Sequence, residues 1–343
     1  MKKSSKNILI SGYYGFDNFG DEAILKILTE KLKELGHKPT VLSSNPEKTS
    51  KLYDVKTIYS FDLKNIIKHI FKADLLISGG GSLLQDATSL KSLIYYLIII
   101  NLCLFFNKKV IIFAQGLGPL HNKFGAFLTK ITLKRCTYLC VRDRKSKLLL
   151  KKWNINNSDL VCDPLFQVPL NNYSPKNKVG IQLRKFKTLN ENYVKRLAQY
   201  VNKHFANMEI EIYSFQDSLD LEICKLFETA LKQENKDIKT KIYSKLTYDE
   251  VIEHFSELKY MIAMRFHANL VSVKYGIKTL AISYDIKVEK FAEEAQIPCL
   301  FMKSDDDFDT AIKEMENENI NKLTEYSNTK VFDWQKIEET ING

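Results

Sequence analysis

Cationic side chains follow two consecutive predicted strands in the second half of the chain. Arg265 and His267 stand where the predicted strand 259–264 becomes a helix, and Lys287 follows the next predicted strand, 279–283. Because neighbouring parallel strands end at one edge of a sheet, we expect these side chains to converge. They would repel one another in an empty site, so the pattern indicates a polyanionic ligand. A histidine alone is more often a core residue, and in this company we interpret His267 as functional.

Arginine is rare in this chain, with six residues against 45 lysines. Four of the six lie at predicted strand ends, where a planar guanidinium can bind an anion through two parallel hydrogen bonds; they are Arg142, Arg144, Arg184 and Arg265. Arg142 follows the predicted strand 138–141, and Asp143 beside it is typical of a helix N-cap. We interpret Arg142 as an anion ligand, with a surface salt bridge as the alternative.

Eight of the 13 glycines form three clusters, each directly after a predicted strand, within residues 12–20, 79–81 and 116–118. Glycine at a strand end lets backbone N–H groups approach a ligand without a Cβ in the way. Any one cluster could be a tight turn, but three on one sheet edge favour a ligand site. Their spacing matches neither the dinucleotide fingerprint nor the Walker loop.

Polar side chains accompany two of these clusters. Asp21 and Glu22 begin a predicted helix, where carboxylates complement the helix dipole or cap its amides. Capping is the better interpretation of Glu22, whereas Asp21 could equally bind a sugar hydroxyl or act as a base. Gln85 and Asp86 offer an amide and a carboxylate for hydroxyl recognition, and a helix start is the alternative.

The elements that position these groups alternate between short β-branched runs and helical patterns. The predicted strands are 7–11, 74–78, 110–114, 138–141, 179–183, 209–213, 239–243, 259–264 and 279–283. Such alternation implies right-handed βαβ units and parallel sheets. We therefore expect an α/β protein with two Rossmann-like, doubly wound domains facing across a cleft.

Chain length and a proline cluster predict the domain boundary. A chain of 343 residues exceeds the size at which one core grows efficiently. Three of the seven prolines fall within 163–177, where no periodicity is visible. We expect a first domain at 1–165, a linker at 166–177 and a second domain at 178–343.

Composition narrows the class of protein. The net charge of +10 comes from lysines scattered over the chain, which is typical of a solvated surface, and no nucleic-acid-binding signature accompanies them. Six cysteines without a Cys-x-x-Cys pair indicate reduced thiols, and the first apolar run is too short for a signal peptide. The most apolar stretch, 93–106, is shorter than the ~20 residues of a spanning helix. We expect a buried helix there, with contact to a membrane surface as the alternative.

Six segments together carry a family pattern. They are 12–24 (GYYGFDNFGDEAI), 78–86 (SGGGSLLQD), 114–119 (AQGLGP), 141–146 (VRDRKS), 265–267 (RFH) and 284–288 (YDIKV). This set resembles the bacterial polysaccharide pyruvyl transferases of the CsaB type. The resemblance implies a GT-B-like pair of domains and transfer of pyruvate from phosphoenolpyruvate to an N-acetylmannosamine-type sugar of a cell-wall polymer, as a 4,6-ketal. Phe266 and Ile286 depart from the pattern, which usually has Leu and frequently Pro there.

The resemblance also implies residue roles, because Asp21, Arg142, His267 and Lys287 match positions that the family needs. We expect phosphoenolpyruvate to be bound across the cleft by Arg142, Arg265, His267 and Lys287. His267 is the expected acid and Asp21 the expected base, with Lys287 as a further catalytic group. The expected acceptor-binding residues are Gly15, Asn18, Asp21, Gly80, Gly81, Gln85, Gln115 and Gly116. We expect no cofactor and no metal site, because the cations would neutralise the donor.

Two other functions stay open at this point. A GT-B nucleotide-sugar glycosyltransferase of cell-envelope glycan synthesis would share the architecture, although no glutamates seven residues apart occur around 265–294. A noncatalytic module could bind anionic polymer through lysines, but it would not need His267 and Lys287 at successive strand ends. We expect a cytoplasmic protein without a nucleic-acid partner, peripheral at the inner membrane face if its acceptor is lipid-linked. The sequence indicates no particular oligomeric state.

Overall fold

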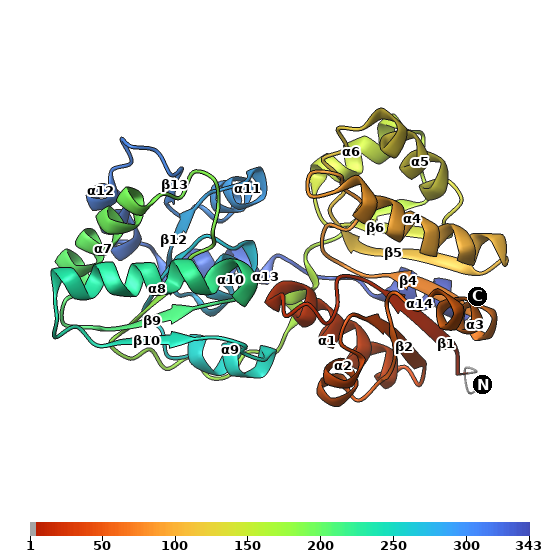
Figure 1. Ribbon diagram of the computed structural model, residues 1–343, viewed down its shortest axis with the longest axis horizontal. Coiled ribbons are helices and arrows are strands. Elements are labelled where there is room, and N and C mark those ends of the chain that lie inside the picture. Colours follow the sequence, from red (N-terminus) through yellow and green to blue (C-terminus); the bar gives the residue numbers. More distant parts are fainter. Residues whose placement is uncertain (1–4) are drawn as a thin grey trace. The chain divides into compact units, whose positions relative to one another are not determined.

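The computed structural model describes residues 5–343, which form two compact α/β units (Figure 1). Unit 1 consists of residues 5–167 together with 331–343, and unit 2 consists of residues 168–330. Each unit contains one wholly parallel sheet with helices in its crossover connections. The expected fold class, α/β with two Rossmann-like doubly wound domains, is therefore confirmed.

Unit 1 has a seven-stranded sheet in the order β3-β2-β1-β4-β5-β6-β7. Its strands are β1 (Asn7–Ser11), β2 (Lys38–Ser43), β3 (Lys56–Tyr59), β4 (Leu75–Ser78), β5 (Lys109–Gln115), β6 (Tyr138–Val141) and β7 (Ser158–Leu160). Its helices are α1 (Phe19–Glu34), α2 (Pro46–Tyr53), α3 (Leu63–Lys72), α4 (Leu90–Phe105), α5 (Lys123–Leu133), α6 (Arg144–Lys152) and α14 (Gln335–Asn342), with a 3-10 turn at Pro164–Gln167.

The strand order of unit 1 reverses between β1 and β4. The chain runs outward from β1 to β2 and β3, then crosses back to β4 and continues to β7. Because crossover connections are right-handed, α1 and α2 lie on one face of the sheet and α3, α4, α5 and α6 on the other. The loops after β1 and β4 diverge at the carboxyl edge, where such sheets open a ligand crevice.

Unit 2 repeats this plan with six strands in the order β10-β9-β8-β11-β12-β13. The strands are β8 (Lys178–Gln182), β9 (Glu209–Tyr213), β10 (Thr240–Tyr243), β11 (Tyr260–Ala263), β12 (Lys278–Ile282) and β13 (Cys299–Leu300). The helices are α7 (Glu191–Phe205), α8 (Asp217–Glu234), α9 (Tyr248–Phe255), α10 (Phe266–Tyr275), α11 (Ile286–Ala295), α12 (Phe308–Glu316) and α13 (Ile320–Asn328). Its strand order reverses between β8 and β11.

Helix α1 shows how the sequence builds these layers. Asn18 caps the helix, because its side-chain oxygen accepts a hydrogen bond from Gly20 N. Ile24, Leu28 and Leu32 recur at i, i+4 and i+8 and are fully buried against the sheet. These three residues form the apolar stripe by which α1 packs on the sheet, and the helix begins within the first glycine cluster.

The last 13 residues belong to unit 1, whereas the sequence analysis placed them in the second domain. Phe332 is buried with its ring centroid 5.4 Å from that of Phe113 on β5, and Trp334 stacks on the same ring at 5.4 Å. Lys336 forms an ion pair with Asp159 on β7 at 2.7 Å. Aromatic burial on β5 thus returns the chain end to the first sheet, a long-range contact that carries no local sequence pattern.

The segment expected as a linker has no helix or strand from residue 168 to 177. It is nevertheless fastened to unit 2, because Ser174 N and Lys176 N donate to the carbonyl oxygens of Ser256 and Glu257 at 2.9 and 2.8 Å. The phenol of Tyr173 donates to Leu258 O at 3.0 Å. The proline cluster therefore marks the end of unit 1, and the segment after it packs as part of unit 2.

Helix α4 contains the most apolar stretch of the sequence. Leu93, Leu97 and Ile100 are buried against the sheet, as expected, but Ile98 and Phe105 are exposed. Within residues 5–343, no helix has both the length and the apolar character that crossing a bilayer requires.

Candidate active site

The three glycine clusters of unit 1 meet at the carboxyl edge of its sheet. A Cβ built on Gly81 would lie 2.4 Å from Oδ1 of Asp21, and Gly81 has a φ of +93°. Gly116 N donates to Gly81 O at 2.9 Å. The Asp21 carboxylate therefore lies directly against the loop after β4, at the point where the strand order reverses, and only glycine fits beneath it.

Tyr14 belongs to the first glycine cluster, and its side chain packs between Gly12 and Gly79 of the second cluster. This residue was not among the predicted site residues. Its side chain is fully buried, and a Cβ on Gly12 or Gly79 would overlap the phenol ring or its oxygen. Burial, with a smaller contribution from the carboxylate of Asp21, raises the pKa of Tyr14 well above its usual value. The phenol stays neutral, and within residues 5–343 its oxygen has no hydrogen-bond partner. The glycines on either side were the signal that could have revealed it.

Glu22 was expected to cap α1. Its carboxylate instead binds the first glycine loop. Its carboxylate accepts hydrogen bonds from Gly15 N and from the phenol of Tyr53, both at 2.7 Å. Burial raises the pKa of Glu22 above its usual value. Gly15 has a φ of +80°, and a Cβ there would lie 2.3 Å from Ser43 Oγ. Two of the expected acceptor ligands, Gly15 and Asn18, thus have structural tasks in this loop.

Two expected acceptor ligands with amide side chains also serve the scaffold. Gln115 is fully buried, and its amide nitrogen donates to Ser78 Oγ at 2.9 Å and to Gly79 O at 2.7 Å, which ties β5 to β4. Gln85 exchanges hydrogen bonds with Thr88 in a local turn. The carboxylate neighbouring Gln85, Asp86, accepts from the backbone N–H groups of residues 121 and 122. A side chain committed to a local or buried partner leaves less capacity for a sugar hydroxyl.

Gly80 and Gly116 permit close packing at the same edge. A Cβ on Gly80 would lie 2.7 Å from Ile24 Cγ2 on α1. A Cβ on Gly116 would lie 3.0 Å from Ser82 Oγ and 3.1 Å from Asp143 Oδ2. Asp143 caps α6 as predicted, accepting from Ser146 N at 2.8 Å.

Arg142 lies beside this edge, and the structure gives it a carboxylate partner. Its Nη1 forms an ion pair with Asp163, and both side chains are almost entirely buried. Gly116 lies within van der Waals reach of the guanidinium. Arg142 therefore forms a salt bridge, as in the alternative interpretation, but the pair is buried and does not lie at the surface. Asp163 also neutralises part of the charge that an anion would meet.

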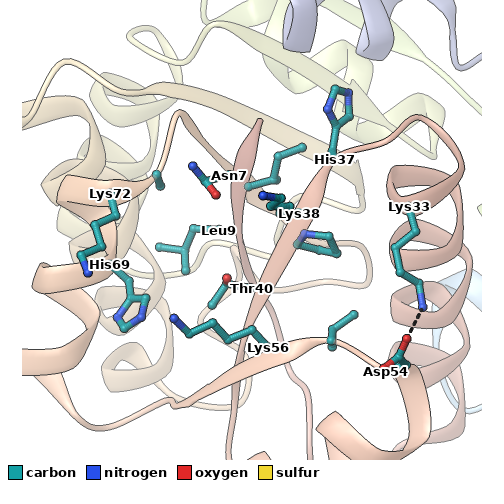
Figure 2. A pocket seen from close by; sticks show the side chains of 14 residues that line it. Asn7, Leu9, Lys33, His37, Lys38, Thr40, Asp54, Lys56, His69 and Lys72 are labelled. Atoms are coloured by element: carbon teal, nitrogen blue, oxygen red, sulfur yellow. Dashed lines mark ion pairs between the residues drawn. The ribbon is translucent and has the colours of Figure 1, made fainter. Parts of the chain in front are cut away.

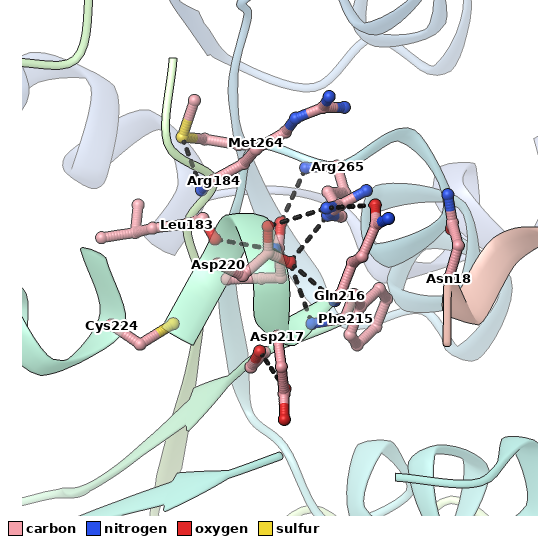
Figure 3. Close-up of polar contacts among 12 residues, drawn as sticks. Asn18, Leu183, Arg184, Phe215, Gln216, Asp217, Asp220, Cys224, Met264 and Arg265 are labelled. Atoms are coloured by element: carbon pink, nitrogen blue, oxygen red, sulfur yellow. Dashed lines mark hydrogen bonds and ion pairs between the residues drawn. The ribbon is translucent and has the colours of Figure 1, made fainter. Parts of the chain in front are cut away.

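In unit 2, Arg265 is held inside the protein (Figure 3). Its Nε and Nη2 donate to the two oxygens of Asp220, each at 2.7 Å, and Nη2 also donates to Gln216 at 3.2 Å. Asp220 is fully buried and accepts two further backbone hydrogen bonds, from Phe215 N and Gln216 N. Burial raises the pKa of Asp220, and the guanidinium opposes that shift. The expected anion ligand Arg265 thus uses its planar fork on a protein carboxylate.

Arg184, which follows β8, is the second arginine at this edge. Its Nη1 donates to the phenol of Tyr284 at 3.1 Å, and its guanidinium lies 5.1 Å from that ring's centroid. Burial raises the pKa of Tyr284, so the phenol is neutral. Within the described residues, Nε of Arg184 is buried without a hydrogen-bond partner. In Figure 3 the guanidinium points away from Asp220. Among residues 5–343, no acidic side chain is a hydrogen-bond partner of Arg184, which makes Arg184 the better candidate for an anion ligand.

His267 and Lys287 lie in the first turns of α10 and α11. These helices follow β11 and β12, which are hydrogen-bonded neighbours, so both side chains leave the same edge of the sheet. His267 is half-buried beside Phe266, with ring centroids 5.0 Å apart. The amides of a helix N-terminus add positive potential near each side chain. Arg184, His267 and Lys287 together give this edge the chemistry of an anion site.

A separate cavity of about 720 Å³ opens at the opposite, amino-terminal end of β1, β2 and β3 in unit 1 (Figure 2). Lysines and histidines line it, among them Lys38, Lys56, Lys72, His37 and His69. Helices α1 and α3 end here, and cations near helix C-termini complement the dipole. The glycine loops and Asp21 lie at the other end of the strands, so this cavity is not the candidate active site.

Comparison with known proteins identifies the family. The model of the family "Polysaccharide pyruvyl transferase" matches residues 18–286, which is most of the chain. The chain belongs to the polysaccharide pyruvyl transferase family. No curated protein sequence matches it significantly. Among residues 5–343 of this family member, no group of three or more His, Cys, Asp or Glu side chains is arranged to hold a metal ion.

Solved structures show the fold of this pyruvyl transferase family member. A UDP-GlcNAc 2-epimerase from Methanocaldococcus jannaschii has a TM-score of 0.65 at 11% identity, covering 94% of this chain and 99% of its own. HepE from Anabaena, solved with UDP-glucose, scores 0.64 at 10% identity, and a glycosyltransferase from Rickettsia africae scores 0.61 at 13% identity; each comparison covers 98% of both chains. The two α/β units are therefore GT-B-like.

Proposed function

We propose that this protein transfers pyruvate from phosphoenolpyruvate to an N-acetylmannosamine-type residue of a cell-wall polysaccharide precursor, forming a 4,6-ketal, as in the CsaB type. The observation that carries the proposal is the cationic carboxyl edge of unit 2 in a member of the pyruvyl transferase family. Phosphoenolpyruvate bears a phosphate and a carboxylate, which suit the guanidinium, imidazole and ammonium groups there. The reaction would take place in the cytoplasm on a lipid-linked acceptor, before export of the glycan.

The donor site in this proposal consists of Arg184, His267 and Lys287. Arg184 contributes the planar fork, because the fork of Arg265 is occupied by Asp220. Arg265 is then a positioning residue, which holds the backbone where β11 becomes α10 and so orients His267. Arg142 remains a candidate anion ligand at the edge of unit 1, held in place by its ion pair with Asp163.

The proposed reaction consists of a protonation and two attacks on one carbon. His267 gives a proton to the C3 methylene of phosphoenolpyruvate, which makes C2 electrophilic. One acceptor hydroxyl attacks C2 and loses its proton to Asp21. The bond from C2 to the phosphate oxygen then breaks, phosphate leaves with the electron pair, and the second hydroxyl attacks C2 and releases its proton. The products are one ketal and one inorganic phosphate.

Asp21 is the proposed base because of its position. Its carboxylate lies against Gly81 at the strand-order reversal of unit 1, where a parallel sheet of this kind binds its ligands. The acceptor sugar would be held there by the backbone of Gly80 and Gly81 rather than by the side chains of Gln85 and Gln115, and Gly116 would support this loop through its hydrogen bond to Gly81 O. Backbone contacts suit a sugar, since its hydroxyls both donate and accept hydrogen bonds.

The test uses the full chain with phosphoenolpyruvate and a panel of β-linked N-acetylhexosaminides. The expected result is phosphate release that requires an N-acetylmannosaminide, together with an acceptor mass increased by one pyruvyl ketal. A parallel series supplies UDP-sugars as donors. Sugar transfer from a UDP-sugar, with no ketal from phosphoenolpyruvate, would replace the proposal by the glycosyltransferase alternative.

A further inference from the structure

Large apolar side chains are exposed on three neighbouring helices of unit 1. Phe105 at the end of α4 is 73% exposed, and Phe124 and Phe127 on α5 are 62% and 58% exposed. Ile98 on α4 and Ile131 on α5 are also exposed, and so is Phe71 at the end of α3. Single exposed apolar residues are ordinary, but a contiguous set marks an interaction surface.

These side chains form stripes along the outer surface of the helices. Phe124, Phe127 and Ile131 recur at i, i+3 and i+7 of α5, and Ile98 and Phe105 are one heptad apart on α4. The two helices lie side by side, because the Asn101 side chain on α4 donates to Thr132 Oγ1 on α5 at 2.8 Å (Figure 1). The stripes are therefore adjacent.

The aromatic surface continues from α4 to α3. The ring centroid of Phe71 lies 4.2 Å from that of Phe106, which in turn lies 5.1 Å from Phe105. Lys108 Nζ donates to Phe71 O at 3.0 Å and fastens the two helix ends together. We call six of the exposed apolar side chains on α3, α4 and α5 the aromatic face; they are Phe71, Ile98, Phe105, Phe124, Phe127 and Ile131.

The same face of the sheet concentrates positive charge. Helices α3, α4, α5 and α6 contain eleven lysines and arginines, three, one, two and five in turn, and not one aspartate or glutamate. Helix α1, on the opposite face, carries four acidic residues beside three lysines. The four helices thus hold as much positive charge as the whole chain shows in net terms, which is +10. Most lysines lie elsewhere in the chain, but on these four helices no acidic residue offsets their charge.

We propose that the aromatic face and the surrounding lysines dock unit 1 onto an anionic phospholipid bilayer. Phenylalanine and isoleucine insert below the headgroups, while lysine stems extend along the surface and each ammonium is attracted by anionic lipid. The helices lie in the plane of the interface. This surface goes beyond the proposed reaction, and its test does not depend on that reaction.

Other occupants fit the face less well. A second copy of the chain would bring the basic helices of two molecules together, and the absence of any acidic residue on them leaves that repulsion uncompensated. A nucleic acid would be attracted by the lysines, but its phosphate backbone would gain no favourable contact from the apolar side chains of the aromatic face. An anionic bilayer is complementary to both properties at once.

The experiment measures co-sedimentation of the full chain with phosphatidylcholine vesicles that contain about a third phosphatidylglycerol. The test variant replaces three exposed side chains, Phe105→Ser, Phe124→Ser and Phe127→Ser. Its matched control replaces exposed apolar residues elsewhere, Phe301→Ser and Val331→Ser. We expect binding that weakens at least about tenfold in the test variant and with pure phosphatidylcholine, and that is unchanged in the control. Thermal melting of each variant verifies that it is folded.

A charge series completes the test. One variant replaces exposed lysines of the basic helices, with the changes Lys64→Glu, Lys68→Glu and Lys123→Glu. The control variant replaces exposed lysines of unit 2, with the changes Lys225→Glu and Lys236→Glu. We expect weaker vesicle binding only in the first set. The proposal is overturned if the chain does not bind vesicles, if both sets weaken binding equally, or if the aromatic variant merely dissociates a dimer. Activity on a water-soluble acceptor should be equal in all variants, so a failed proposal for the reaction would leave the binding result interpretable.

Discussion

Two arginines at the carboxyl edge of unit 2 have different tasks. Arg265 is buried and bound through two nitrogens to Asp220, whereas the guanidinium of Arg184 donates to a neutral phenol. From the sequence, both residues are arginines that follow strands, and nothing local reveals that Asp220, 45 residues away, occupies one of them. A bidentate partner on another helix is a tertiary contact, and this is why we propose Arg184 in place of Arg265 as the anion ligand.

The same substitution at these two arginines should give opposite results. Arg265→Lys keeps the charge but loses the bidentate bond, so we expect the free energy of unfolding of unit 2 to fall by about 1.5–3 kcal/mol. Arg184→Lys should leave that free energy nearly unchanged and raise KM for phosphoenolpyruvate by about ten- to a hundredfold. Urea unfolding and steady-state kinetics of both variants make the comparison. A stable Arg265→Lys enzyme with a raised KM would restore Arg265 as the anion ligand.

Replacement of His267 by Gln separates an acid from a ligand. Gln keeps a hydrogen-bond donor but has no proton to transfer, so kcat should fall by about 10²–10⁴ and the basic limb of the pH profile should vanish. A histidine that only binds phosphate predicts a raised KM with substantial kcat. Thermal melting is measured alongside, because a variant that melts early and keeps full activity in its folded fraction would assign His267 to the core.

At the scale of elements, the glycine loops position the proposed base. Gly81→Ala should reduce kcat more than tenfold, since its Cβ would overlap the Asp21 carboxylate. The matched control is Gly36→Ala, because Gly36 also has a positive φ, +79°, but its Cβ would have nothing within 4 Å. Both should lose about 1–2 kcal/mol of stability to backbone strain. Equal activities in the two variants would remove Asp21 from the reaction.

The partly buried carboxyl of Glu318, which lies beside the start of β12, makes the stability of unit 2 depend on pH. Burial raises the pKa of Glu318 to about 8, from 4.5, although Thr279 N donates to it at 2.7 Å. Between these two values the carboxyl is ionised in the unfolded chain and protonated in the folded one, so the contribution of Glu318 to stability is lost as the pH rises from about 4.5 to about 8. The free energy of unfolding of Glu318→Gln should equal that of the parent protein at pH 4. At pH 9 it should exceed that of the parent by about 2–4 kcal/mol. Glu314→Gln, exposed on α12, is the control, and parallel pH profiles of parent and Glu318→Gln would contradict the prediction.

The strands that the sequence analysis found and missed differ in length and polarity. The strands that end in the candidate site, β1, β4, β8, β11 and β12, were all predicted, because each is an apolar run followed by turn residues or a helix start. Four were missed: β2 contains Pro39, β3 alternates weakly, and β7 and β13 have only three and two residues. The pairing of edge strands as short as β7 and β13 is specified by their neighbouring strands rather than by their own periodicity.

In the molecule as a whole, residues 331–343 pack back onto unit 1. Phe332 is buried near Phe113, so Phe332→Ala should lower the free energy of unfolding of unit 1 by about 3–5 kcal/mol. Hydrogen exchange should rise in the β5 peptide and stay unchanged in β8 and β9. The neighbouring Val331→Ala, 72% exposed, serves as the control. Faster exchange confined to unit 2 would contradict the assignment of residues 331–343 to unit 1.

In the proposed reaction, C3 of phosphoenolpyruvate is protonated while its C2 becomes a ketal carbon. The most direct measurement is the reaction of the full chain in D₂O, with mass and NMR analysis of the methyl group in the sugar product. The proposal predicts a ketal methyl that carries one deuterium, with one phosphate released for each ketal. A product whose methyl group contains no solvent-derived hydrogen, or phosphate release without any ketal, would contradict it.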